Sequence, residues 1–269
     1  MATIEKEVTK FWWNIYESCF AGTHFKKKNA LFMSTSNNIP SGSVFTLKKN
    51  LFSKIVDKSL IFKYNTLEKL DNFPKIKDFS LTANSPCNSE YSFTNLTAID
   101  VYGKLIDGTN IGKINAELQT ILKKSKTLKI NISKWGIDYI EEGALELFLQ
   151  KYLIKKDAMI LKITDGDHYI ATEGIYIEGM SFSYELDKEV VQKIKAIYND
   201  NSAKFIEFGV KINISSETSL TTDFEYKEKV YPFLKFKKIK TDGNIKAMIK
   251  GLETTKVLLE DIDFYDEIN

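Results

Sequence analysis

The feature that most constrains the fold is a strict alternation of apolar and polar residues, which recurs in long segments of the chain. The segment 127–133 shows it, with Leu128, Ile130 and Ile132 alternating with Lys129, Asn131 and Ser133. In an extended strand successive side chains point to opposite faces, so this pattern makes one face apolar and the other polar. The segment therefore predicts a strand of a sheet that has one solvated face.

Three further segments carry the same alternation: 91–105, 169–186 and 204–214. The alternation in 169–186 slips near Glu178-Gly179, where a glycine indicates a β-bulge. Apolar residues at helical spacing lie at 111–122 and at 188–198, between the members of each pair of strands. The chain therefore contains two strand-helix-strand units.

Shorter elements are predicted elsewhere: a helix in 4–19, short strands in 30–70, a polar loop in 71–90, a helix in 138–156 and a short strand in 158–164. The first helix carries two tryptophans on or beside its apolar face, which favours core packing over a role at a membrane interface. All these elements together predict an α+β fold, with a twisted, mainly antiparallel central sheet and flanking helices.

Composition excludes several classes of protein. The 38 basic and 36 acidic residues nearly cancel, and every basic residue is lysine, so a nucleic-acid partner is not expected. Two cysteines, Cys19 and Cys87, are too few for a disulfide framework or for a structural zinc site, which favours a reducing, cytoplasmic setting. The chain shows no N-terminal signal pattern and no run of 18 apolar residues.

No catalytic constellation stands out. His24 and His168 lie far apart and have no cysteine or carboxylate at ligand spacing. The run GTNIGK at 108–113 lacks the spacing and the Ser or Thr of a phosphate loop. Asp165-Gly166-Asp167 lacks the closing Glu of a calcium loop and predicts a turn. We therefore expect no enzyme, no cofactor and no metal site.

Charge is distributed unevenly near the C-terminus. Residues 227–250 hold eight lysines and two acidic residues, whereas 253–269 hold six acidic residues and one lysine. The acidic segment also carries an apolar set: Val257, Leu258, Leu259, Ile262, Phe264, Tyr265 and Ile268. It is either an ordinary C-terminal helix or a tail that docks as a short helix on the basic region, and cutting a connecting loop would release a weakly docked tail.

Several segments then follow in a distinctive order: LKINISKWG from residue 128, LELFLQKYL from 145, DAMILKI from 157 and HYIATEGI from 168. A Ser/Thr-rich run, KINISSETSLTTDFEY, follows and is closed by KVYPFLKFKKIKTDG. This order, best matched over 95–243, resembles the pore-forming domain of the bacterial gasdermins. The motifs are patterns of apolar and Ser/Thr positions and contain no catalytic residues.

The resemblance implies an autoinhibited protein with a pore-forming domain at 1–243 and a linker with an inhibitory peptide at 244–269. It implies that a partner protease cuts the exposed linker within 244–255, in the region of Lys250, Gly251 and Leu252. The inhibitory residues would be Leu258, Leu259, Ile262, Phe264 and Tyr265. Once the peptide is removed, many copies would assemble a membrane β-barrel pore that kills the infected cell, as an antiviral defence.

The resemblance also implies that two regions, about 96–133 and 169–214, open into transmembrane hairpins. The lipid-facing residues would be Ile99, Val101, Leu128, Ile130, Ile132, Met180, Phe182, Phe208, Val210 and Ile212. The residues facing lipid head groups would be Lys26, Lys27, Lys28, Lys235, Lys237 and Lys238. The expected partners are an activating protease, anionic lipid and further copies of the chain, and the expected location changes from the cytoplasm to the inner membrane on activation.

Two features depart from the pattern of the family. Bacterial members often carry a lipidated cysteine in their first few residues, whereas MATIEKEV has none and Cys19 lies on the apolar side of the first predicted helix. We do not expect the large C-terminal inhibitory domain of the animal gasdermins, which fits the compact bacterial type with a short tail. An alternative function stays open, because alternation is also expected of an antiparallel sheet that never leaves water. The alternative is a soluble α+β binding or immunity protein without membrane activity.

Overall fold

The sheet that the alternation predicts is present in a computed structural model of the chain. The structure describes residues 9–10, 12–21, 27–33, 37–49, 56–92, 127–207, 210–252 and 254–264. These residues form one nine-stranded sheet whose pairings are all antiparallel. Its strands are β1 Ala30–Phe32, β2 Val44–Lys49, β3 Val56–Phe62, β4 Lys77–Ser92, β5 Thr127–Tyr139, β6 Tyr169–Glu185, β7 Val210–Ile214, β8 Ser219–Thr241 and β9 Val257–Asp261. The predicted α+β class is confirmed.

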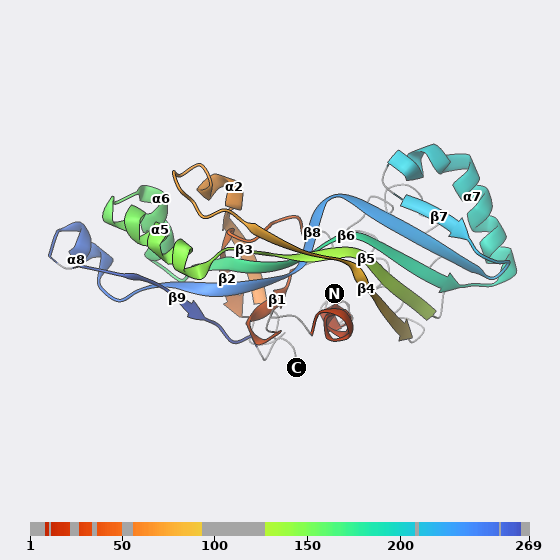
Figure 1. The fold of residues 1–269 in the computed structure, drawn as a ribbon, viewed down its shortest axis with the longest axis horizontal. Helices are drawn as coiled ribbons and strands as arrows, with labels where there is room; N and C mark the ends of the chain where they lie inside the picture. Colours follow the sequence, from red (N-terminus) through yellow and green to blue (C-terminus); the bar gives the residue numbers. More distant parts are fainter. Residues whose placement is uncertain are drawn as a thin grey trace.

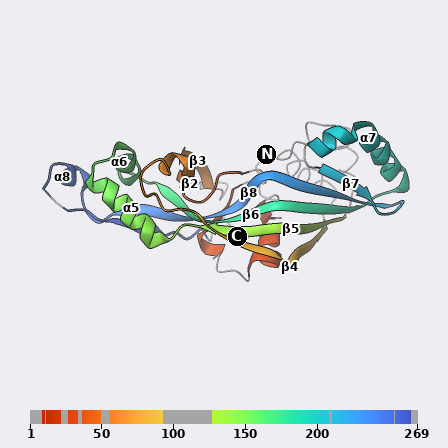
Figure 2. The same cartoon turned by 45° about the horizontal axis from the view of Figure 1, so that its top comes forward.

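The helical elements lie mainly at the two ends of the sheet. They are η1 Tyr16–Phe20, η2 Lys27–Asn29, α2 Tyr64–Leu67, α5 Glu142–Ile154, α6 Ala158–Thr164, α7 Lys188–Glu207 and α8 Ile245–Ile249. Figure 1 shows α5, α6 and α8 at one end of an elongated molecule and α7 at the other, with η1 against the middle of the sheet. The turned view in Figure 2 shows the same separation of α5 and α6 from α7.

β6 and β8 pair with each other and form the centre of the sheet. The other edge of β6 pairs with β2 at its start and with β5 along the rest, and β4 and β3 extend the sheet beyond β5 and β2. The other edge of β8 is covered by three short strands in succession, β7, β1 and β9. The C-terminal tail therefore occupies the last part of this edge.

Three apolar clusters hold the sheet and the helices together. The largest joins η1 and the preceding helical residues to β5, β6, β7 and α7, and it includes Trp12, Trp13, Phe20, Trp135 and Phe233. The second lies under α5 and α6, and the third lies around Leu31, Phe45 and Phe236. The tryptophans of the N-terminal segment are thus core residues, as the sequence favoured.

Several predicted elements are confirmed. β5 covers 127–133 and continues to Tyr139, and α5 begins after it. β6 matches 169–186, and its pairing with β8 shifts register between Ile175 and Ile177 and between Ile177 and Gly179, as the phase slip predicts. α7 contains 188–198, with Val191 and Ile194 buried.

Other predictions are wrong. Segment 71–90 is a loop only up to residue 76, because β4 runs from Lys77 to Ser92. The pairing of β4 with β5 shifts register between Thr82 and Cys87, close to Pro86. Segment 158–164 is the helix α6, because the Asp157 side chain accepts hydrogen bonds from the backbone N–H groups of Met159 and Ile160 and caps it. Residues 204–207 belong to α7, so the strand expected from 204 begins at Val210.

Two predictions fall largely outside the described residues. The strand expected at 91–105 is described only at Tyr91 and Ser92, which end β4, and the helix at 111–122 is not described. For the first strand-helix-strand unit, the structure therefore shows β4 and β5 as an antiparallel pair with 93–126 between them.

Candidate membrane-inserting strands and docked C-terminal tail

Alternating rows of residues cross five strands at one end of the sheet. Apolar residues dominate three rows, each read from β4 through β5, β6 and β8 to β7: Cys87-Ile132-Met180-Phe224-Val210, Ser89-Ile130-Phe182-Thr222-Ile212 and Tyr91-Leu128-Tyr184-Leu220-Ile214. Two polar rows lie between them: Asn88-Asn131-Ser181-Asp223-Lys211 and Glu90-Lys129-Ser183-Thr221-Asn213. Because neighbouring rows face opposite sides, this part of the sheet, here called the amphipathic half-sheet, has one mainly apolar and one polar face.

Two helical segments cover the apolar face of the half-sheet. One is residues 12–20, here called the N-terminal cover, and the other is α7. Beneath them Ile132, Met180 and Ile212 are 0%, 4% and 6% exposed. The polar face carries hydrogen bonds between strands, including one between the Ser183 and Thr221 hydroxyls and one from Asn213 to Asp223.

Three of the predicted lipid-facing residues, Ile132, Met180 and Ile212, are buried on the apolar face of the half-sheet. For Leu128, Ile130, Phe182 and Val210 the structure gives the strand pairing, which places them in the three rows listed above. Ile99, Val101 and Phe208 lie outside the described residues. No helix of the described chain is long and apolar enough to span a bilayer.

The second predicted hairpin, 169–214, is not a hairpin in this structure. β8 lies between β6 and β7 and is antiparallel to both, so β6 and β7 are parallel and α7 crosses between them. The 20 residues of α7 span about 30 Å as a helix and would span about 66 Å as a strand. Converting this unit into a hairpin therefore requires α7 to melt and β6 and β7 to find new partners.

The C-terminal tail docks as a strand, and not as the short helix that we expected. Residues 257–261 form β9, which pairs with Lys237–Thr241 of β8. α5 holds the same segment from the other side: the Glu146 carboxylate accepts a hydrogen bond from the Leu259 N–H, and the Gln150 side chain accepts one from the Val257 N–H, at 2.9 and 2.7 Å. The tail is thus bound on one side by the backbone of β8 and on the other side by side chains of α5.

Beyond β9 the tail reaches the N-terminal part of the chain. The Asn29 side chain donates to the Ile262 carbonyl at 2.6 Å, and the Phe264 N–H donates to the Lys28 carbonyl at 2.8 Å. Ile262 and Phe264 pack against the cluster around Phe45 and Phe236.

The predicted inhibitory residues differ in burial. Leu259, Ile262 and Phe264 pack against the apolar clusters, whereas Leu258 is 47% exposed and Tyr265 lies outside the described residues. Val257 belongs to the same apolar set and is the best-buried apolar residue of the described tail, at 5% exposed.

Carboxylates pair with the lysines of β8 on both faces. On one face Lys237 is only 7% exposed and pairs with Asp261 and Glu142, each at 2.9 Å, and Lys235 pairs with Glu173. On the other face Lys240 pairs with Glu260 and Lys238 pairs with Asp167.

The pairing of Lys237 with Asp261 shifts the pKa of both groups. Burial opposes the charge of Lys237, but its hydrogen bonds to Asp261 and Glu142 raise its pKa above the ordinary value. The hydrogen bond from Lys237 lowers the pKa of Asp261. Both partners of this pair are therefore charged at neutral pH.

Three of the six predicted lipid-contacting lysines, Lys235, Lys237 and Lys238, pair with carboxylates in this conformation. Lys235 and Lys237 were expected to be exposed, but they are buried because they face Glu173 and Glu142, and Lys238 is held by Asp167. Lys28 is exposed, and nothing is described of Lys26 or of the Lys27 side chain.

The predicted cleavage region is accessible. Lys250, Gly251 and Leu252 are exposed and follow α8, and Leu252 is 72% exposed. Gly251 has φ +76°, and the N–H groups of Gly251 and Leu252 close the helix by donating to the Met248 and Ala247 carbonyls. A protease that cuts here would have to unwind only a five-residue helix.

A polar network that the sequence did not reveal ties four strands together in the middle of the sheet. Tyr231 donates a hydrogen bond to Asp138, Tyr176 donates to Asp78 at 2.7 Å, and Lys229 donates to both carboxylates. Burial raises the pKa of Asp138. Burial opposes the charge of Asp78, but hydrogen bonds from Lys229 and Tyr176 hold its pKa below the ordinary value. Alternation alone does not show which strands meet, so these partners could not be matched in the sequence.

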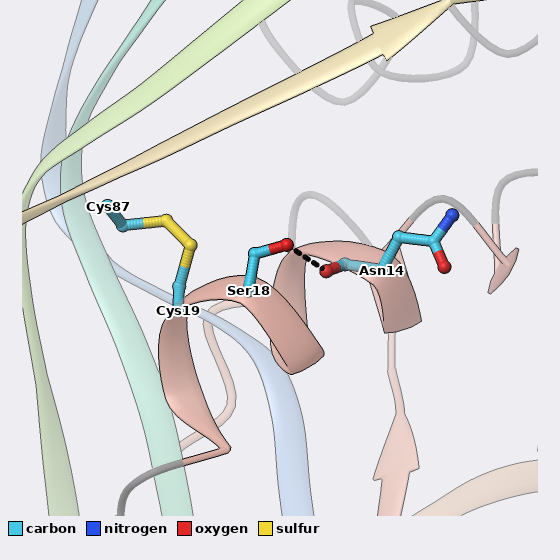
Figure 3. Close-up of a disulfide and its surroundings, with 4 residues drawn as sticks. All are labelled: Asn14, Ser18, Cys19 and Cys87. Atoms are coloured by element: carbon cyan, nitrogen blue, oxygen red, sulfur yellow. Dashed lines mark hydrogen bonds between the residues drawn. A yellow bond between two sulfur atoms is a disulfide. The ribbon is translucent and has the colours of Figure 1, made fainter.

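The two cysteines, which we did not expect to pair, are joined by a disulfide (Figure 3). Cys19 lies in η1 and Cys87 lies in β4, 68 residues along the chain, with their Cα atoms 5.2 Å apart. The sequence contained no signal for this contact, because it depends on how the N-terminal cover sits on β4.

Comparisons with known proteins find similarity in structure and none in sequence. No protein-family model and no curated protein sequence matches the chain. In structure the chain is similar to a bacterial gasdermin from Bradyrhizobium tropiciagri, with 10% sequence identity over 84% of this chain and 83% of that chain and a TM-score of 0.46.

Proposed function

We propose that the chain is an autoinhibited, non-enzymatic pore-forming protein of the gasdermin kind. The observation that carries the proposal is the amphipathic half-sheet, in which strands far apart in sequence align their apolar residues in common rows under a helical cover. Transmembrane strands need the same alternation, with apolar side chains toward lipid and polar side chains toward a lumen. In this reading the lipid-facing surface already exists and is shielded from water.

The lengths of the strands suit a bilayer. A tilted strand crosses the hydrocarbon core with about 9 to 11 residues. β5, β6 and β8 have 13, 17 and 23 residues, so each is long enough. Strands that insert must also pair every backbone group, and in our proposal copies of the chain provide this by closing a ring.

The docked tail supplies the inhibition. It covers the last part of the free edge of β8, bonds to α5 and neutralises Lys237 and Lys240. Its removal would leave Lys240 without Glu260, whereas Lys237 would lose Asp261 and keep Glu142. A freed lysine near an anionic membrane surface contributes about 1 kcal/mol of attraction. Proteolysis within 244–255 would thus unblock a strand edge and create positive charge in one step.

The proposed partners and setting follow from this cycle. A protease activates the protein, anionic lipid receives it, and further copies of the chain complete the pore. The protein would act from the cytoplasm on the inner membrane, and the resulting leak would kill an infected cell as an antiviral defence.

Dye release from anionic liposomes tests the proposal. We would compare the full-length protein with versions that end at several points between residues 243 and 256, after checking by circular dichroism that each is folded. Leakage only from shortened versions supports an autoinhibited pore. If folded, shortened versions remain soluble and monomeric and release no dye, the chain is better explained as a soluble α+β binding or immunity protein.

A further inference from the structure

A covalent bond fastens the N-terminal cover to the half-sheet that it shields. Cys19 belongs to the cover, and Cys87 stands opposite Ile132 in the first apolar row. Figure 3 shows the disulfide running from the helical segment to the strand. Cys87 is 5% exposed, while Cys19 is partly exposed.

Two aromatic residues of the cover, Tyr16 and Phe20, lie on either side of Cys19 in the sequence. Tyr16 packs edge-on against Phe233 of β8, and Phe20 packs against Trp135 of β5, with ring centroids 5.5 and 4.6 Å apart. While the disulfide is intact, this segment cannot move away from β4. The apolar row beneath it then stays shielded even if the tail has gone.

We propose that the Cys19–Cys87 disulfide is a redox-sensitive latch on membrane insertion, so that release of the strands needs both removal of the tail and reduction of this bond. The inference rests on the proposed function, because it concerns the same strands. The latch and the inhibitory tail act at different places in the sheet. The tail strand β9 pairs with β8, whereas the disulfide is attached to β4 on the other side of the sheet.

The reducing step is a two-electron thiol-disulfide exchange with a dithiol reductant. A thiolate of the reductant attacks the Cys19 sulfur, which is the more exposed one, and Cys87 leaves as a thiolate that takes up a proton. The second thiol of the reductant then displaces Cys19 and closes the reductant into a disulfide. The chain gains two thiols and the reductant loses two.

The test uses the full-length chain with a specific protease site in place of residues 250–252. The protein is oxidised or treated with dithiothreitol, then cut in the presence of anionic liposomes loaded with dye. Because a cross-link across a long loop strongly disfavours local opening, we expect the oxidised protein to release dye at least about tenfold more slowly than the reduced one. Cys87→Ser should leak at the reduced rate with or without dithiothreitol, and Ser18→Ala, an exposed neighbour in the cover, should behave as the parent protein does.

A second readout keeps failure of the latch distinct from failure of the pore. Equal dye release by the oxidised and the reduced protein would contradict the redox latch, while dye release itself would still support the proposed pore. If no version leaks, the proposed function fails, and amide hydrogen exchange on the uncut chain decides the latch. If reduction makes amide hydrogen exchange in residues 12–20 at least about tenfold faster, the latch is supported. If the exchange rate does not change, the latch is excluded. Two free thiols after mild oxidation would also overturn it.

Discussion

At the scale of single residues, Asp261 is the clearest link between the tail and the sheet. It is the tail carboxylate that pairs with buried Lys237, so Asp261→Asn should weaken docking by about 1 kcal/mol while keeping the shape of the side chain. The expected result is a lower thermal midpoint and faster dye release from the uncut chain.

Glu260→Gln is the matched control for this prediction. Glu260 lies in the same strand, but its partner Lys240 is exposed, so the effect should be smaller. Equal effects of the two substitutions would contradict a special role for the buried pair.

At the scale of elements, α7 is the part that must melt before 169–214 can become a hairpin. Lys195→Gly lies on the exposed side of α7 and should lower the stability of the helix by about 1 kcal/mol without touching the core. If melting α7 limits insertion, dye release after cleavage should become up to about fivefold faster. Lys151→Gly makes the same change in α5, which is not expected to melt, and should leave the rate unaltered. A slower rate for Lys195→Gly would exclude melting of α7 as the limiting step.

Some predicted helices and strands were wrong because the local sequence pattern fits both kinds of element. Residues 158–164 and 204–207 are apolar or mixed over short windows, which suit a strand or a helix equally. A side-chain cap at Asp157 decides the first case, and continuation of the long helix α7 decides the second. The tail shows the same ambiguity, because VLLED becomes a strand only where the edge of β8 supplies backbone partners.

At the scale of the whole molecule, His168 predicts how global stability changes with pH. Burial, with the nearby charge of Lys162, lowers the pKa of His168 below its ordinary value of 6.5. A base with a lowered pKa in the folded state contributes stability above its unfolded pKa and loses it as pH falls, so the free energy of unfolding should decrease below about pH 6.5. The slope from one such group is at most about 1.4 kcal/mol per pH unit. Urea unfolding of the parent and of His168→Gln between pH 7.5 and 5 measures it, and parallel curves would exclude His168 as the cause.

The sequence by itself determined the faces of the strands, the bulge in β6, the helical character of 188–198 and the opposition of an acidic tail to a basic strand. Each of these depends on neighbours within a few residues, or on net charge, and so can be read along the chain. The tertiary structure alone decided which strands align their apolar rows, that the tail docks as β9, that Lys235 and Lys237 are buried, and that Cys19 meets Cys87. These features arise from contacts between residues far apart in the chain, and they are set by register and packing, which local patterns do not encode.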